Sequence, residues 1–290
     1  MISRDKPATR GNRLIQAILV IAVFLFLTII PDAAVHWLGL AKTVGHLAQA
    51  KFISQLLFAG LYVTQQLVTL CLCVMFIMLL FRKALLQALR ELGLGNNFKT
   101  GWLLGLAATL PMPVIFSIVG HASFNAEIAL QVIVFGLFTG FAEETLFRGF
   151  AFGLLYRKVH LGFWLSIILP TVFFAAGHLY QVHGILDSLG ILAVTGLGSL
   201  WFAWLYVRWE YNLWVPIAMH GLMDSWWTVF SASGTALGNT EANLARLLTI
   251  LLSIVLTLWH CHWDWRKAFI HIRPSQPFSV SEATGAQVRD

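Results

Sequence analysis

Charged residues are scarce in this chain of 290 residues, where Asp, Glu, Lys and Arg together make up 11% of the sequence. Soluble domains usually contain about 25% charged residues. The hydrophobic fraction is 58%, which leaves too little polar surface for a protein in water. The net charge is +6, but the basic residues do not concentrate in one segment. The composition therefore excludes a soluble globular protein and gives no support for nucleic-acid binding.

Cysteines are also few, and they do not follow the pattern of a disulfide framework. Cys71 and Cys73 lie in one apolar run, and Cys261 lies near the end of another. We expect reduced, buried thiols that pack as small hydrophobic side chains.

Long apolar runs dominate the sequence. A helix needs about 20 apolar residues to cross the hydrocarbon core of a bilayer, and about eight segments qualify. We therefore predict an all-α, polytopic bundle of transmembrane helices in which Pro111 and Pro113 kink the third span. Pro170 lies inside the fifth. The first run is too long for a typical signal peptide, so we expect it to be retained. The predicted spans are 14–30, 52–81, 102–119, 127–158, 161–180, 189–207, 213–230 and 244–263.

The basic residues predict the orientation of these spans. Cytoplasmic loops carry an excess of Lys and Arg, and the observed alternation with an even number of spans places both termini in the cytoplasm. The opposite side carries mainly Lys42 and Lys51, plus Arg246. The predicted cytoplasmic side carries the basic residues within 4–13, 82–99, 157–158, 208 and 266–273.

Several ionisable residues interrupt the apolar spans, and each is costly there, by about 2.5 to 3.5 kcal/mol. Glu144 and Arg148 are four residues apart, so they can pair on one helix face. Glu143 is turned about 100° away and needs a partner from another helix. His178 follows Phe174 by one turn in the fifth span, and in the seventh span the sequence HGLMD places a second such pair, His220 and Asp224.

These side chains suit hydrolysis if they line one cavity. A carboxylate removed from water can act as a general base near neutral pH, and a neighbouring imidazole can help to hold the attacking water. A second histidine with a hydrogen-bonding neighbour can stabilise the oxyanion of a tetrahedral intermediate. Small residues would let the helices approach closely around the site; these are Gly149, Gly177, Gly196, Gly198 and Gly221.

A metal site is an alternative use of the same residues. A zinc ion could be bound by Glu143, His178 and His220, since catalytic zinc commonly takes three N or O ligands plus water. The sequence has no His-Glu-x-x-His motif of the zincins. We rank a glutamate-based mechanism without cofactor above the zinc alternative.

The three motifs EETLFR, FAAGH and HGLMD resemble, in order and separation, those of the CAAX prenyl endopeptidase and bacteriocin-processing (CPBP, or Abi) family of intramembrane proteases. The resemblance implies that Glu143 activates water with His178, and that Glu144 and Arg148 support the site. It further implies that His220 and Asp224 stabilise the oxyanion. Asp224 stands where members that process prenylated proteins usually have Asn. An ionised Asp accepts hydrogen bonds but does not donate them, so Asp224 would be protonated or would orient His220.

The resemblance implies an integral protein of a bacterial inner membrane, in contact with lipid, that cleaves a peptide or protein substrate near the membrane, possibly a lipidated one. The expected division of the chain is a two-span N-terminal region at 1–99, a catalytic helical core at 100–230, a final span at 231–263 and a polar cytoplasmic tail at 264–290. The main alternative is a non-enzymatic scaffold or immunity protein of the same fold. A proton-relay transporter is a further one. A cavity shared by Glu143, His178 and His220 would favour the enzyme.

Overall fold

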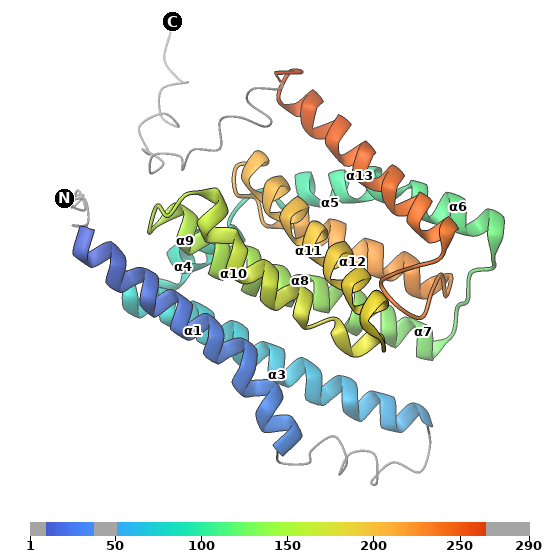
Figure 1. Cartoon of the computed structure of the whole chain (residues 1–290), viewed down its shortest axis with the longest axis horizontal. Coiled ribbons are helices and arrows are strands. Elements are labelled where there is room, and N and C mark those ends of the chain that lie inside the picture. The colour runs from blue at the N-terminus through green and yellow to red at the C-terminus, as the bar shows by residue number, and fades with distance from the viewer. Residues whose placement is uncertain (1–9, 38–50, 265–290) are drawn as a thin grey trace, which may run out of the picture.

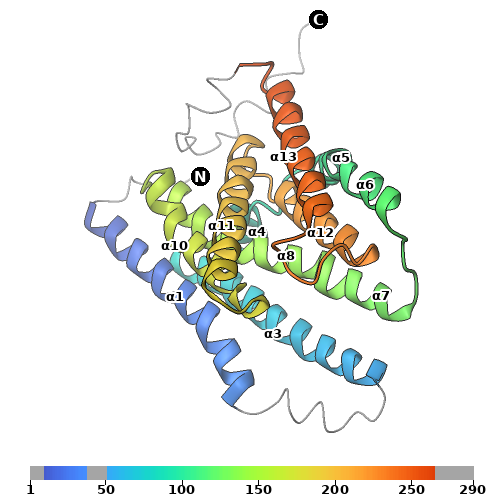
Figure 2. The ribbon, with the colours of Figure 1, turned by 45° about the vertical axis from the view of Figure 1, so that its right-hand side comes forward.

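The computed structural model describes residues 10–37 and 51–264, and every regular element within these ranges is a helix. Figure 1 shows α1 and α3 along one side of the bundle, with α5, α6 and α13 on the opposite side, and the rotated view in Figure 2 agrees. The predicted all-α bundle is therefore confirmed. In chain order the helices are α1 (Arg10–Trp37), α3 (Lys51–Leu80), α4 (Leu85–Leu92), α5 (Phe98–Thr109), α6 (Pro111–Val119), α7 (Ala126–Gln131), η1 (Val132–Phe138), α8 (Thr139–Glu144), η2 (Thr145–Phe152), α9 (Gly153–Arg157), α10 (Phe163–Ala176), η3 (Leu179–Gln181), α11 (Ile185–Arg208), α12 (Trp214–Val229) and α13 (Thr240–His260).

Among the described residues, 7 segments are long and apolar enough to cross a membrane. The predicted count of about eight differs because the segment predicted at 213–230 forms α12, which has 16 residues. At about 1.5 Å per residue this helix is about 24 Å long, which is short of the bilayer core. The 7 segments are Gly11–Pro31, Phe52–Leu80, Phe98–Val119, Ala126–Arg157, Phe163–Gln181, Ile185–Arg208 and Thr240–His260.

Helix α12 lies inside the bundle. It packs against α5, η1 and α8, and also touches α11. Val215, Ala218 and Met219 are fully buried, whereas the outer helices expose large apolar side chains such as Ile118 and Leu197. This distribution fits a membrane protein, whose outer surface contacts lipid and whose interior holds the costly polar groups. The short, buried α12 is therefore the element that carries polar side chains to the centre.

Prolines affect two of the predicted segments differently. The segment predicted at 102–119 breaks at Leu110 into α5 and α6, with Pro111 as the first residue of α6. Pro170 lies inside α10. The segment Ala126–Arg157 is continuous but changes its winding, since η1 and η2 are π-helical and the α-helical turn α8 lies between them. Glu143 and Glu144 end that turn, between two stretches of a winding that is often found at functional sites.

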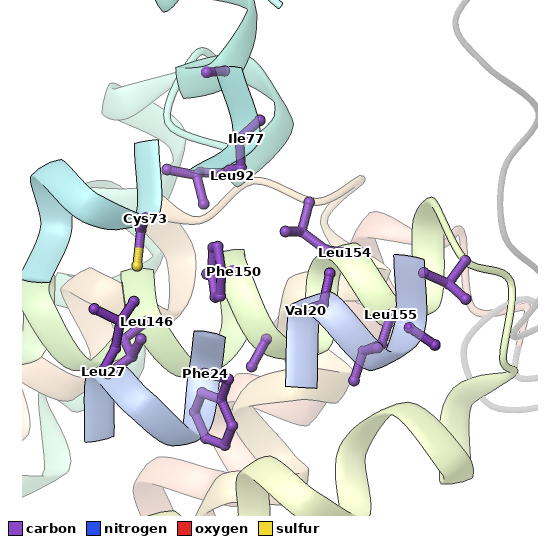
Figure 3. Close-up of a cluster of buried hydrophobic side chains, with 14 residues drawn as sticks. Val20, Phe24, Leu27, Cys73, Ile77, Leu92, Leu146, Phe150, Leu154 and Leu155 are labelled. Atoms are coloured by element: carbon purple, nitrogen blue, oxygen red, sulfur yellow. The ribbon is translucent and has the colours of Figure 1, made fainter. Parts of the chain in front are cut away.

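A hydrophobic cluster joins the first two long helices to the segment that carries the glutamates. In Figure 3, Phe24 of α1 and Cys73 of α3 lie on either side of η2, which contributes Leu146 and Phe150. Cys73 is buried as expected, whereas Cys71 is exposed, because residues two apart on a helix face different sides. The cluster fixes α1 and α3 against the central segment.

Some predictions concern residues outside the described ranges. These are the basic residues of 4–9 and 266–273, Lys42, and all but the first residue of the predicted tail at 264–290. The cytoplasmic location of both termini was predicted from an even number of spans, whereas 7 described segments are long and apolar enough to cross a membrane. It stays a prediction, as does the division of the chain at 99, 230 and 263.

Candidate active site

The structure brings the three predicted motifs to one cavity of about 1620 Å³. Glu143 reaches it from α8, His178 from the turn after α10, and both His220 and Asp224 from α12. Helices α1, α3, α11 and α13 line other parts of the same cavity. A cavity shared by Glu143, His178 and His220 was the feature expected of an enzyme and not of a tightly packed scaffold. The structure has such a cavity.

His220 lies at the centre of a group of carboxylates. Its Nδ1 is 2.8 Å from Glu144 Oε1, and its Nε2 is 3.3 Å from Asp224 Oδ2 and 3.9 Å from Glu143 Oε2. Because an ionised carboxylate can only accept a hydrogen bond, Nδ1 donates to Glu144. Nε2 is therefore the nitrogen that remains for the cavity.

The two adjacent glutamates have different surroundings. The Glu144 side chain is fully buried, whereas 26% of the Glu143 side chain is exposed. Glu144 is 3.0 Å from Arg148 in the same helical segment, as the spacing predicted, but it also holds His220, which the sequence did not indicate. One carboxylate thus belongs to the frame of the site, and the other faces the cavity.

Arg148 is stabilised by charge and by aromatic rings. Its Cζ lies 4.4 Å from the centre of the Phe174 ring and 5.4 Å from that of Phe202. The ion pair with Glu144 is not an aligned hydrogen bond, and the guanidinium has no hydrogen-bonding partner among the described residues. Cation–π contacts are strongest where water is excluded, as here, where Arg148 is fully buried.

Two phenylalanines shape the site around the ionisable groups. Phe174 is buried, as core packing requires, yet its ring also contacts those of His178 and His220, with centroids 4.8 and 6.1 Å apart. Phe202 stacks on His220 at 5.4 Å. Phe202 had no motif of its own in the sequence, because an aromatic residue in an apolar span resembles any other core residue.

His178 lies in the turn after the C-terminal end of α10, and its Nδ1 is 2.7 Å from the carbonyl oxygen of Phe174. A carbonyl only accepts, so Nδ1 carries the proton and Nε2 is left as an acceptor. His178 and Glu143 line the same cavity. No direct hydrogen bond joins these two side chains in the part of the chain that the structure describes.

Glycines allow α8 and α12 to meet. A Cβ atom at Gly140 would lie 2.7 Å from the backbone nitrogen of Gly221, and one at Gly149 would lie 2.9 Å from the Leu92 carbonyl oxygen. Gly149 and Gly221 therefore sit at close approaches, as predicted. Gly198 does not, because a Cβ there would meet nothing within 4 Å. The contact between Gly140 and Gly221 brings the residue before Gly221, which is His220, to the glutamates.

The residues of the site do not form a metal centre in the described structure. No group of three His, Cys, Asp or Glu side chains within residues 10–37 and 51–264 is arranged to hold one ion. Nδ1 of His220 is engaged by Glu144, so only Nε2, which also lies 3.3 Å from Asp224 Oδ2, faces the cavity. The zinc set Glu143, His178 and His220 does not fit this arrangement, and no step below uses a metal.

With this geometry in hand, the chain can be compared with known proteins. Residues 125–226 match the family model described as Type II CAAX prenyl endopeptidase Rce1-like. The predicted resemblance is thereby confirmed for the region that contains all six residues of the motifs. This part of the chain is thus similar to CAAX-protease-like peptidases, and it lies in a protein with 7 described segments long and apolar enough to cross a membrane. No curated protein matches the chain, and no solved structure matches it.

Proposed function

We propose that this protein hydrolyses a peptide bond at the membrane, with Glu143 as the general base. The observation that carries the proposal is the contrast between Glu143, which is exposed to the cavity, and Glu144, which is buried and paired. Only the exposed carboxylate can reach a water molecule. Both the cavity and the match to a peptidase family favour this function over a scaffold or immunity role.

In the proposed reaction, Glu143 takes a proton from a water molecule that His178 holds through Nε2. The oxygen of that water attacks the carbonyl carbon of the substrate, and the carbonyl oxygen becomes an oxyanion. His220 donates from Nε2 to the oxyanion, because Nδ1 is engaged with Glu144. The intermediate collapses as the C–N bond breaks, and the proton on Glu143 passes to the leaving nitrogen. The products are a free carboxylate and a free amine.

The surrounding residues have positioning roles in this proposal. Glu144 holds His220 by Nδ1, and Arg148 balances the charge of Glu144. Asp224 is an acceptor at 3.3 Å from His220 Nε2, so we assign it the orientation of the ring rather than donation to the oxyanion. The apolar part of the cavity wall, with residues such as Leu27, Phe147 and Trp164, suits a membrane-embedded or lipidated segment of the substrate. A location in a bacterial inner membrane stays a prediction.

The proposal is tested by comparing new protein termini in cells that express wild type or Glu143→Gln at equal membrane levels. Glu241→Gln is the matched control, because Glu241 is exposed at the start of α13 and does not line the cavity. We expect termini that are present with wild type and with the control variant and absent with Glu143→Gln. Termini that persist with Glu143→Gln would refute Glu143 as the general base. If wild type produces no termini above an empty vector, the peptidase function itself fails.

A further inference from the structure

One arginine shares the cavity with the proposed catalytic residues. Arg246 is the only Lys or Arg among the described residues that line it. The other charged groups in the wall are Glu143 and Asp224, together with the two histidines. Arg246 lies in α13, outside the residues that match the family model. Its place in the wall therefore reflects the fold of this chain and not the three motifs.

The side chain of Arg246 is held in place by neutral groups. Its Nη1 donates to Asn243 Oδ1 at 3.0 Å, and its Nη2 donates to the Ala236 carbonyl oxygen at 2.7 Å. The guanidinium carbon lies 4.9 Å from the centre of the Trp227 ring. Trp227 is three residues after Asp224 on α12, and both residues line the cavity together with Arg246. The contacts orient the guanidinium without neutralising its charge.

The loop that carries Ala236 is itself tied to the neighbourhood of His178. The backbone nitrogen of Ala236 donates to Gln181 Oε1 at 2.8 Å, and Trp227 Nε1 donates to the Ser233 carbonyl oxygen at 3.0 Å. Gln181 is three residues after His178, in η3. Arg246 is therefore fixed relative to the turn that carries His178 and to helix α12, which carries His220.

A cation held in this way lowers the electrostatic cost of bringing an anionic substrate group into the cavity. An anionic group of a peptide that enters the cavity is repelled by Glu143 and Asp224 unless a positive charge lies nearby. Arginine carries five N–H donors in a planar fork that matches a carboxylate, and within the described residues Arg246 makes two hydrogen bonds. Arg246 can therefore both offset the repulsion and fix the direction of a carboxylate.

We propose that Arg246 binds a carboxylate of the peptide substrate and so selects which bond lies at Glu143. The carboxylate belongs either to the C-terminus of the substrate or to an Asp or Glu side chain near the cleaved bond. This inference rests on the proposed peptidase function. It makes Arg246 a specificity-determining residue, which recognises substrate at a distance from the reacting atoms.

The test uses a short synthetic peptide that spans a cleavage site found in the comparison of protein termini, with the full-length enzyme in detergent micelles. The peptide is made with a free acid or an amide at its C-terminus, and with its acidic side chains intact or replaced by their neutral amides. The values of kcat/KM are measured for wild type, Arg246→Met and Arg246→Lys. Arg90→Met is the matched control, because Arg90 is exposed on α4 and does not line the cavity.

We expect neutralising one carboxylate to lower kcat/KM of the wild type by about 10- to 100-fold, the range for a charge-assisted hydrogen bond. In Arg246→Met the same neutralisation should change kcat/KM less than about twofold, and Arg246→Lys should restore part of the discrimination. Because each ratio is taken within one variant, a loss of folded enzyme cancels. The carboxylate whose removal matters identifies the source.

Equal ratios in wild type and Arg246→Met, for both the terminal and the side-chain carboxylates, would overturn the proposal. A loss of discrimination in Arg90→Met as large as that in Arg246→Met would overturn it as well. Failure of the wild type to cleave any form of the peptide would instead count against the peptidase function, so the two failures are distinct.

Discussion

Removal of the Arg148 guanidinium tests quantitatively the buried pair of Glu144 and Arg148, the frame that holds His220. Glu144 and Arg148 are both fully buried and 3.0 Å apart. Breaking a buried pair by removing one partner costs about 3 to 5 kcal/mol, because an uncompensated charge stays in the interior. Arg148→Met keeps apolar volume between the rings of Phe174 and Phe202, and Glu144 keeps its 2.8 Å contact with His220. We therefore expect the lower end of that range, about 3 kcal/mol.

The measurement is a double-mutant cycle on reversible unfolding in mixed detergent micelles, followed by Trp fluorescence. The cycle compares wild type, Glu144→Gln, Arg148→Met and the double variant. Replacing both charged partners by neutral ones is often close to neutral, so the double variant should be more stable than Arg148→Met. The control is Lys158→Met, because Lys158 pairs with Glu91 at 2.6 Å with 28% of its side chain exposed. A partly exposed pair of this kind contributes about 0 to 1 kcal/mol.

The reasoning would be refuted if the free energy of unfolding of Arg148→Met equalled that of the wild type. It would also be refuted if the effects of the two single variants added without coupling, since residues that do not interact add. In either case the charges would be stabilised by water rather than by each other, and the frame proposed for His220 would have to be abandoned.

Two further predictions concern how the site is assembled. Gly140→Ala should lower stability by about 1 to 3 kcal/mol and also lower cleavage, because its Cβ would lie 2.7 Å from the Gly221 nitrogen. Gly198→Ala is the control: its Cβ meets nothing within 4 Å, so stability and cleavage should stay unchanged. Equal behaviour of the two alanine variants in unfolding and cleavage assays would contradict the close approach. Asp224→Asn should retain more activity than Asp224→Ala, because the amide keeps an oxygen that accepts from His220 Nε2; the opposite order in kcat would rule out the orienting role of Asp224.

Much of the fold could be predicted because bilayer thickness imposes a minimum length on apolar runs. The all-helical architecture, the breaks near Pro111 and the pairing of Glu144 with Arg148 all depend on local rules of helix geometry. The nature of α12 could not be predicted by those rules. Its composition resembles that of a span, and only its packing inside the bundle shows that it is a short internal helix.

The site was predictable to the extent that ionisable residues stand out in an apolar sequence. The six residues of the motifs were identified for that reason, and four of them line one cavity. Phe202 was missed because nothing distinguishes it from other aromatic residues in a span. From the sequence, Arg246 is only a basic residue on the side opposite the predicted cytoplasmic one. Its place in the cavity wall depends on how α13 packs against the other helices.

The sequence by itself determined the class of the protein, the helices, and the residues whose burial needs an explanation. Those features follow from composition and from contacts within about one helical turn, which act along the chain. The tertiary structure alone decided which glutamate faces the cavity, which nitrogen of His220 is engaged by Glu144, and which cation joins the wall. Each of these depends on how separate helices are rotated and how closely they approach, and that is set by packing at glycines such as Gly140 and Gly221 rather than by any local pattern.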